Sequence, residues 1–206
     1  MPDRGGWWAS AVVEGDVDEA VLSKIAETLS LNLSAVYGRI GKQYIYSRIG
    51  AYNRAARFSP WIILLDLDDD APCAAELISR VLPQPSQFLS LRIAVKAVES
   101  WLLADRKEFA AFIGVAQSQI PDAPDSIPDP KTFVVTLARN SRKPNIVREL
   151  VPRPGAKKRV GPAYTSRLIE FVLHKWDPSR AEELSDSLRR CREGIQGLGS
   201  LVPSHE

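Results

Sequence analysis

The sequence of 206 residues holds few of the side chains that zinc sites and disulfide frameworks require. It has two histidines and two cysteines, and Cys73 and Cys191 are too far apart to form a CxxC pair. This composition disfavours zinc and disulfides, and reduced thiols are consistent with the cytosol. No apolar run approaches the roughly 18 residues of a membrane span, and the N-terminus lacks the apolar core of a signal peptide. We therefore expect a cytoplasmic protein with no membrane partner.

Sequence patterns of several common protein classes are also missing. Residues 38–43 read Gly-Arg-Ile-Gly-Lys-Gln, which has neither the spacing nor the Ser or Thr of a P-loop. The chain is therefore not an ATPase of that type by itself. The glycines near the C-terminus follow no first strand, which argues against a Rossmann nucleotide site. No Ser-His-Asp set is suggested either.

Charge is nearly balanced overall but uneven along the chain. The formal net charge is +2, with 45% hydrophobic and 25% charged residues, as in ordinary globular proteins. Residues 139–159 contain eight basic side chains and one acid, Glu149, a local balance of +7. Such a stretch predicts affinity for nucleic acid that weakens with salt.

Alternating strand and helix patterns predict an α/β fold in the first part of the chain. Apolar runs alternate with helical periodicities, which predicts an open parallel sheet of about four strands flanked by helices. The expected strands are residues 8–13, 33–37, 61–67 and 88–95, and the expected helices are residues 16–31, 42–58, 72–82 and 96–112.

Composition changes after residue 113. Eight of the fifteen prolines fall between Pro121 and Pro162, which predicts loops and short elements there. Two helices are expected beyond them, at residues 163–176 and 179–195. We therefore expect a metal-binding α/β core at residues 1–113. Residues 114–206 would form a Pro-rich basic segment and a C-terminal helical elaboration that packs on the core.

Two carboxylate clusters follow apolar strands and are the most informative feature of the sequence. Glu14 follows the first strand, and Asp66 and Asp68 lie where the third strand ends. Ligand sites of open parallel sheets lie beyond the carboxyl ends of the strands, so neighbouring strands would bring these three together. On an extended chain Asp66 and Asp68 share a face while Leu67 points into the core. Like charges about 4 Å apart repel by roughly 4 kcal/mol, so a hard divalent cation is the expected compensator.

Asp18 extends the first cluster. A helix beginning near Gly15 would keep Asp18 and Glu14 within reach of one ion. Helix capping and compensation of the helix dipole are the better explanation for Asp16 and Glu19. For Asp18 both interpretations stay open.

These motifs resemble the Toprim domain, which topoisomerases, primases, recombination proteins and OLD-family nucleases share. The resemblance rests on a strand ending in Val-Glu-Gly, a helix, and a later strand ending in Asp-x-Asp. The spacing from Glu14 to Asp18 is similar to the OLD-type variant. Residues 94–105 resemble small stand-alone Toprim-like proteins of uncharacterised function, which often accompany ATPase partners in bacterial defence loci. The resemblance covers residues 8–113 and, more weakly, the region from Lys158 to Pro162.

The resemblance implies a Toprim-like sheet whose Glu14, Asp66 and Asp68 hold Mg²⁺ or Mn²⁺ for phosphoryl transfer or phosphodiester cleavage. Glu99 would complete a second metal site, or would be an exposed residue at the start of a helix. Lys158 is similar to a late lysine of OLD-type nucleases and would neutralise transition-state charge. The alternative for Lys158 is a solvated basic loop that binds nothing in particular.

We therefore expect a metal-dependent nuclease, or a related phosphodiester-cleaving enzyme, that acts on nucleic acid. The expected catalytic residues are Glu14, Asp66, Asp68 and Lys158, and the expected metal ligands are Glu14, Asp18, Asp66, Asp68 and Glu99. A second hypothesis is a Toprim-fold regulatory or interaction subunit that works with a partner ATPase and has little activity alone. A haloacid-dehalogenase-like phosphatase also uses a strand-terminal Asp-x-Asp, but Glu14 would then have no role.

Overall fold

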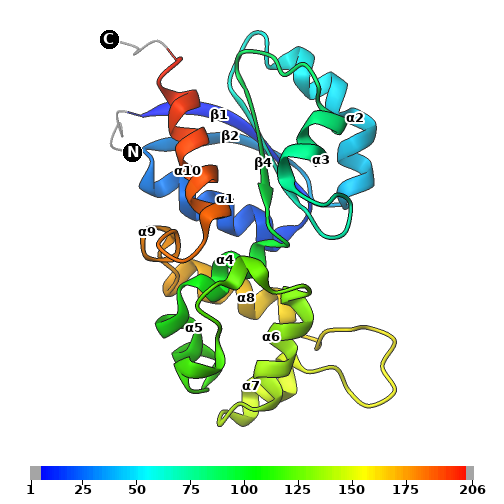
Figure 1. Cartoon of the computed structure of the whole chain (residues 1–206), viewed down its shortest axis with the longest axis vertical. Helices are drawn as coiled ribbons and strands as arrows, with labels where there is room; N and C mark the ends of the chain where they lie inside the picture. The colour runs from blue at the N-terminus through cyan, green and yellow to red at the C-terminus, as the bar shows by residue number, and fades with distance from the viewer. Residues whose placement is uncertain (1–5, 203–206) are drawn as a thin grey trace.

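Four parallel strands form the centre of the computed structural model, which describes residues 6–202 (Figure 1). The sheet has the order β2-β1-β3-β4, so β1 and β3 are interior neighbours. Helices flank the sheet, and further helices follow it in the chain, as the sequence predicts. The strands are β1 (Trp7–Val13), β2 (Leu31–Gly38), β3 (Trp61–Asp66) and β4 (Leu89–Ala94).

The two interior strands are almost entirely apolar where they pair. Residues 11–13 of β1 and residues 62–65 of β3 are fully buried. A strand covered by helices on both faces requires such a continuous apolar run, which is why the apolar runs of the sequence identified both strands. The two strands end beside each other, with Val12 in register with Ile63. Their carboxyl ends therefore meet at one edge of the sheet.

Helices cover both faces of the sheet. Ile62 packs in the cluster that contains α1 (Asp16–Thr28), whereas its neighbour Ile63 packs in the cluster that contains residues of α2 (Lys42–Ala55) and α3 (Ala74–Val81). Successive side chains of a strand thus pack alternately into two separate hydrophobic layers, one on each face of the sheet.

Several expected helix bounds are wrong. The first helix ends at Thr28 rather than at residue 31, because Leu31 already starts β2. The helix begins at Asp16 itself, with Gly15 in the cap position and no side-chain cap. Asp16 therefore does not cap the helix. The expected helix at residues 96–112 is two helices, α4 (Val98–Ala104) and α5 (Arg106–Ile113).

The Pro-rich segment holds more helix than the sequence predicts. It contains α6 (Pro130–Arg139) and α7 (Pro144–Leu150), together with two short 3₁₀ turns at Gln117–Gln119 and Pro124–Ser126. Each of the two helices opens with a proline, where the missing N–H has no intrahelical role. The sequence prediction treated these prolines as helix breakers, although a proline is also common in the first turn of a helix.

The remaining helices pack against the α/β part. They are α8 (Tyr164–His174), α9 (Pro178–Ala181) and α10 (Asp186–Gly199). The single helix expected at residues 179–195 is therefore two helices, α9 and α10. Figure 1 shows α5 to α8 in a lobe beside the sheet, with α10 returning alongside β4. One hydrophobic cluster runs from β1 through α4 to α8 and α10, so the core continues past residue 113. Within residues 6–202, no helix is both long enough and apolar enough to cross a membrane.

Candidate functional site

Glu14 and Asp66 meet at the carboxyl edge of β1 and β3, as the sequence predicts. Glu14 is the first residue after β1, and Asp66 is the last residue of β3. The backbone N–H of Asp66 donates to Oε1 of Glu14 over 2.7 Å. Two carboxylates that lie 52 positions apart in the sequence are therefore neighbours because their strands are.

Asp66 is held from two further elements. Its side chain is 2% exposed. One carboxylate oxygen accepts from the backbone N–H of Val98 at the start of α4, over 2.9 Å. The other lies 3.1 Å from Nζ of Lys131 in the first turn of α6. The sheet edge, α4 and α6 thus converge on this one side chain.

Asp68 lies at the same edge, but its carboxylate pairs with a lysine of a different helix. Its backbone is left-handed, with φ of 47°, so the extended alternation from Asp66 ends before it. Its carboxylate pairs with Nζ of Lys42 on α2 over 2.7 Å. The same ammonium lies 2.9 Å from a carboxylate oxygen of Asp70 and 3.9 Å from Oε1 of Glu14. Asp66 and Asp68 therefore engage lysines from two different helices, α6 and α2, and the left-handed backbone at Asp68 interrupts the extended alternation that was expected to give the two carboxylates one face.

Two more carboxylates are buried behind this edge. Asp18, in the first turn of α1, is 7% exposed, and Glu99, in the first turn of α4, is 2% exposed. Glu99 is therefore not an exposed residue at a helix start. Its Oε1 accepts from the hydroxyl of Tyr164 over 3.2 Å. The other oxygen of Glu99 and Oδ1 of Asp18 are buried and have no hydrogen-bond partner among the residues that the structure describes.

Burial and mutual repulsion raise the pKa values of these carboxyl groups. Burial is the larger cause for Glu14, with a contribution from Asp66, and together they raise the pKa of Glu14 to about 7. Burial and Asp66 likewise raise the pKa of Glu99 to about 7, against the opposing effect of Lys131. The pKa of Asp18 is raised well above its ordinary value by burial, then by Asp66 and Glu14. These carboxyl groups therefore keep their protons to higher pH than exposed carboxyl groups do.

The lysines respond in the opposite direction. Burial lowers the pKa of Lys131, but Glu99 and Asp66 outweigh burial and leave that pKa above its usual value. Burial also lowers the pKa of Lys42, and hydrogen bonds to Asp68 and Asp70 more than restore it. Both ammonium groups are therefore charged at neutral pH.

The donor chemistry of this cluster suits a hard divalent cation. Carboxylate oxygens are the preferred ligands of Mg²⁺ and of Mn²⁺. The oxygens of Asp18 and Glu99 that lack partners are of this kind, and an unpaired buried carboxylate is costly. Across residues 6–202, however, no three His, Cys, Asp or Glu side chains are already grouped as a ready-made metal site. In this arrangement the ammonium of Lys42 bridges Asp68 and Asp70, and the ammonium of Lys131 pairs with Asp66.

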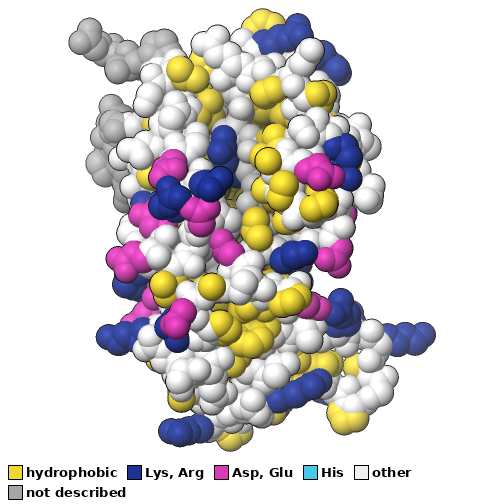
Figure 2. Space-filling model, in the orientation of Figure 1, with side chains coloured by type: hydrophobic (Ala, Val, Ile, Leu, Met, Phe, Trp, Pro, Cys, Tyr) yellow, Lys and Arg dark blue, Asp and Glu magenta, His cyan; other side chains and the backbone are white. Residues whose placement is uncertain are grey.

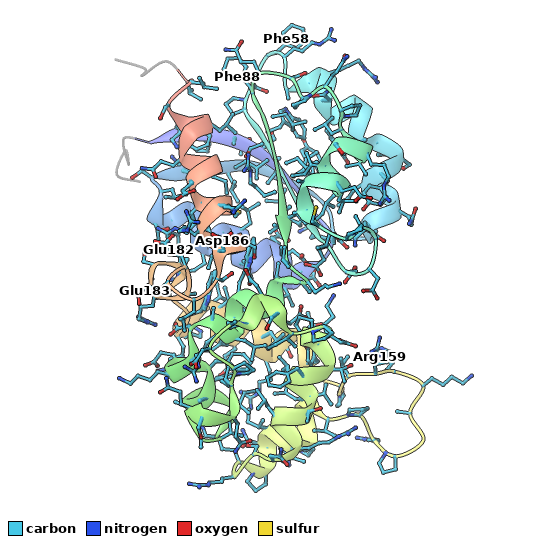
Figure 3. The ribbon with its side chains drawn as sticks, in the orientation of Figure 1. Phe58, Phe88, Arg159, Glu182, Glu183 and Asp186 are labelled. Atoms are coloured by element: carbon cyan, nitrogen blue, oxygen red, sulfur yellow. The ribbon has the colours of Figure 1, made fainter. Side chains whose placement is uncertain are left out.

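Lys158 lies apart from the cluster in the exposed loop between α7 and α8. Figure 1 shows this loop projecting from the helical lobe, and Figure 2 shows basic side chains extending from the same corner. Its neighbour Arg159, labelled in Figure 3, pairs with Asp129, and it donates to the Thr132 hydroxyl over 2.9 Å. The loop is thereby fixed to the start of α6, the helix that supplies Lys131. Lys158 itself has no side-chain hydrogen bond within the described part of the chain.

Sequence reasoning missed Lys131 and Tyr164. Lys131 carries a positive charge in the first turn of a helix, where the dipole disfavours it. That unfavourable placement after Asp129-Pro130 was the one available indication of a carboxylate partner. Tyr164 had no comparable indication, because an aromatic residue at the start of a helix reads as an ordinary packing residue.

Part of the basic stretch at residues 139–159 has partners within the protein. Lys143 donates to the carbonyl oxygens of Ala111 and Phe112 over 2.7 and 3.2 Å and so satisfies the end of α5. Glu149 pairs with Arg167 over 2.5 Å. The other basic side chains of the stretch are exposed, both before the α7–α8 loop (Arg139, Arg142 and Arg148) and within it (Arg153, Lys157, Lys158 and Arg159).

Comparison with known proteins adds no relative: no family model, no curated protein and no solved structure matches this chain. The functional argument therefore depends on the geometry of the acidic edge alone.

Proposed function

We propose that this protein is a divalent-metal-dependent enzyme that cleaves phosphodiester bonds in nucleic acid, with a Toprim-like catalytic edge. The observation that carries the proposal is the gathering of carboxylates at the ends of two adjacent parallel strands. Glu14 contacts Asp66 directly, and two buried carboxylate oxygens nearby lack partners among the described residues. Clusters of this composition need a cation, and an Mg²⁺ or Mn²⁺ ion fits the all-oxygen donor set.

The residues that would hold the cation lie on both sides of the Glu14–Asp66 contact. Bound there, the cation would polarise a phosphoryl oxygen and favour attack by water. The proposed ligands are Glu14, Asp18, Asp66, Asp68 and Glu99.

The lysines have a second role in this proposal. Lys131 touches Asp66, and Lys42 touches Asp68, so each ammonium lies where a phosphate bound at the edge would meet it. A charged donor aimed at developing negative charge stabilises a phosphoryl-transfer transition state. Lys158, on the loop that Arg159 fixes beside α6, is the further candidate for holding the phosphate backbone.

A regulatory or interaction subunit that works with a partner ATPase is the second candidate. One observation favours it: Lys42 and Lys131 already neutralise part of the acidic cluster in the arrangement described. Such a subunit would use the same fold without needing turnover of its own.

A cleavage assay with matched variants separates the two candidates. Supercoiled plasmid and single-stranded RNA are incubated with the purified chain and Mn²⁺ or Mg²⁺. We expect metal-dependent nicking that falls by about 100-fold or more in Asp66→Asn. The control is Asp16→Asn, whose exposed side chain lies outside the cluster and whose activity should stay at the wild-type level. Cleavage that persists in Asp66→Asn at the wild-type rate would remove the catalytic assignment, and no cleavage by any form would favour the subunit.

A further inference from the structure

The outer edge of β4 has no strand beside it in the described chain. β4 is the last strand in the order β2-β1-β3-β4. The backbone N–H groups of Trp61 and Leu67 donate to the carbonyl groups of Phe88 and Ala94, each over 2.8 Å, so the even-numbered residues of β4 turn their main-chain groups toward β3. The N–H and C=O groups of Leu91 and Ile93 therefore point away from the sheet. Leu91 and Ile93 are only 5% and 6% exposed, so these edge groups are reached through the groove that they line. Unpaired edge groups are a template for another extended segment.

A groove of about 530 Å³ runs along this edge. β4 forms its base, α3 supplies one wall and α10 supplies the other. Figure 2 shows hydrophobic side chains on one side of the hollow and basic side chains mixed with acidic ones on the other, and Figure 3 labels Asp186 at the start of α10. The wall from α3 is apolar and consists of Ala74, Ala75 and Ile78.

The opposite side of the groove holds an arginine without a carboxylate partner. Arg92 lies half-buried, where its Nε donates to the hydroxyl of Ser90 over 2.8 Å and a terminal nitrogen donates to the carbonyl of Arg190 over 3.5 Å. Gly194 permits this position, because a side chain there would collide with the guanidinium. Within residues 6–202, the side-chain hydrogen bonds of Arg92 go to Ser90 and Arg190, and none goes to a carboxylate. A half-buried charge without a counter-ion favours an anionic partner.

We propose that the β4 edge binds an extended peptide segment of a partner protein as a fifth strand, with an acidic side chain opposite Arg92. Leu91 and Ile93 would exchange main-chain hydrogen bonds with the segment, as in other cases of strand addition. Because side chains alternate along a strand, the residues flanking the acid would point to the other face, against Ala75 and Ile78. The expected sequence pattern of the partner segment is therefore apolar–acidic–apolar.

A second copy of this chain fits the groove less well. Antiparallel pairing of two β4 strands in the register centred on Arg92 would place Arg92 opposite its own copy. Like charges directly opposite each other on paired strands are destabilising. Asp125 and Asp186 also line the groove, but Asp186 is paired with Arg189 and Arg190, and Asp125 accepts from Ser185 and Ser187. The groove is therefore complementary to a segment with one acidic side chain, positioned opposite Arg92.

The test uses a labelled probe peptide, acetyl-Thr-Val-Glu-Val-Thr-Val-amide, and fluorescence anisotropy with the full chain. We expect saturable binding, and binding at least about tenfold weaker when the central Glu of the peptide is replaced by Gln. The same peptide with every amide N-methylated should not bind, because it cannot pair with the main chain of Leu91 and Ile93.

The variant Arg92→Gln distinguishes recognition of charge from damage to the fold. It should weaken the Glu peptide by about tenfold and leave the Gln peptide unchanged, whereas a structural defect would weaken both. Equal binding of the Glu and Gln peptides to the wild-type chain would overturn the proposal. So would binding of the N-methylated peptide at full strength, an absence of saturable binding, or a self-association of the chain that the peptide blocks.

Discussion

Single side chains at the acidic edge are expensive to bury, and that cost has a measurable pH dependence. Glu14 and Glu99 each have a pKa raised to about 7, mainly by burial. Between about pH 4.5 and 7 these groups keep their protons in the folded chain, whereas the unfolded chain loses them. The unfolded state then binds fewer protons, so rising pH favours unfolding.

We therefore predict that, without divalent metal, the free energy of unfolding falls by on the order of a few kcal/mol from about pH 4.5 to about pH 7. Glu14→Gln should flatten this slope, because an amide does not titrate. Urea unfolding at a series of pH values measures the free energy of unfolding and gives this slope. Glu27→Gln, at an exposed position on α1, serves as the control and should keep the wild-type profile. A slope that Glu14→Gln leaves intact would contradict the buried-carboxylate account.

The contact between Glu14 and Asp66 was predictable because it needs only that two apolar strands be neighbours and parallel. Lys131 was not predictable in the same way. It reaches Asp66 from a helix 65 positions later, and no periodicity places α6 over that edge. The proposed ligation by these residues is still a prediction.

At the scale of elements, apolar runs in the sequence located every strand, whereas the ends of the helices depended on particular residues. The helix after β4 breaks at Asp105, whose carboxylate accepts from Arg180 over 2.7 Å and from the backbone N–H of Asp177 over 3.1 Å. That break is made by partners more than 70 positions away, which a local pattern does not contain. Pro130 and Pro144 show the converse case, since local sequence did hold the helix starts but was interpreted as loop.

The end of β2 is a second element-scale feature, because it fixes the residue before Glu14. Gly38 has φ of +92°, and a Cβ there would collide with the carbonyl oxygen of Val13. We predict that Gly38→Ala lowers the free energy of unfolding by about 2 kcal/mol or more, through both strain and collision. Gly155→Ala is the matched control, because Gly155 has φ of +77° but open space around its Cα. Its cost should be about 1 kcal/mol or less, and chemical denaturation compares the two. Equal costs would show that the collision is not real.

At the scale of the whole molecule, α4 connects the sheet to the helical lobe. The indole of Trp101 on α4 donates to the hydroxyl of Ser187 over 2.7 Å, and the indole of Trp176 donates to the carbonyl of Trp101 over 3.1 Å. Both tryptophans belong to the hydrophobic cluster that β1 and α8 share. The chain should therefore unfold as one cooperative unit.

A pair of variants in α8 tests this shared core. Phe171→Ala, at a fully buried position, should lower the free energy of unfolding by about 3–5 kcal/mol. Leu173→Ala, at a position that is 50% exposed on the same helix, should cost less than about 1 kcal/mol. Tryptophan fluorescence and far-UV circular dichroism should give coincident denaturation curves for all forms. Two separate transitions, with Phe171→Ala affecting only one of them, would show that the lobes fold independently.

The most direct test of the central claim is equilibrium binding of Mn²⁺, followed by the electron paramagnetic resonance signal of the free ion. Wild type should bind Mn²⁺ more tightly as pH rises from 6 to 8, since Glu14 and Glu99 lose their protons over about that range. Asp18→Asn should weaken binding by about tenfold or more, whereas Asp16→Asn, two positions away on the surface, should leave it unchanged. Mn²⁺ affinity that is the same in wild type, Asp18→Asn and Asp16→Asn would contradict a metal centre at this edge of the sheet.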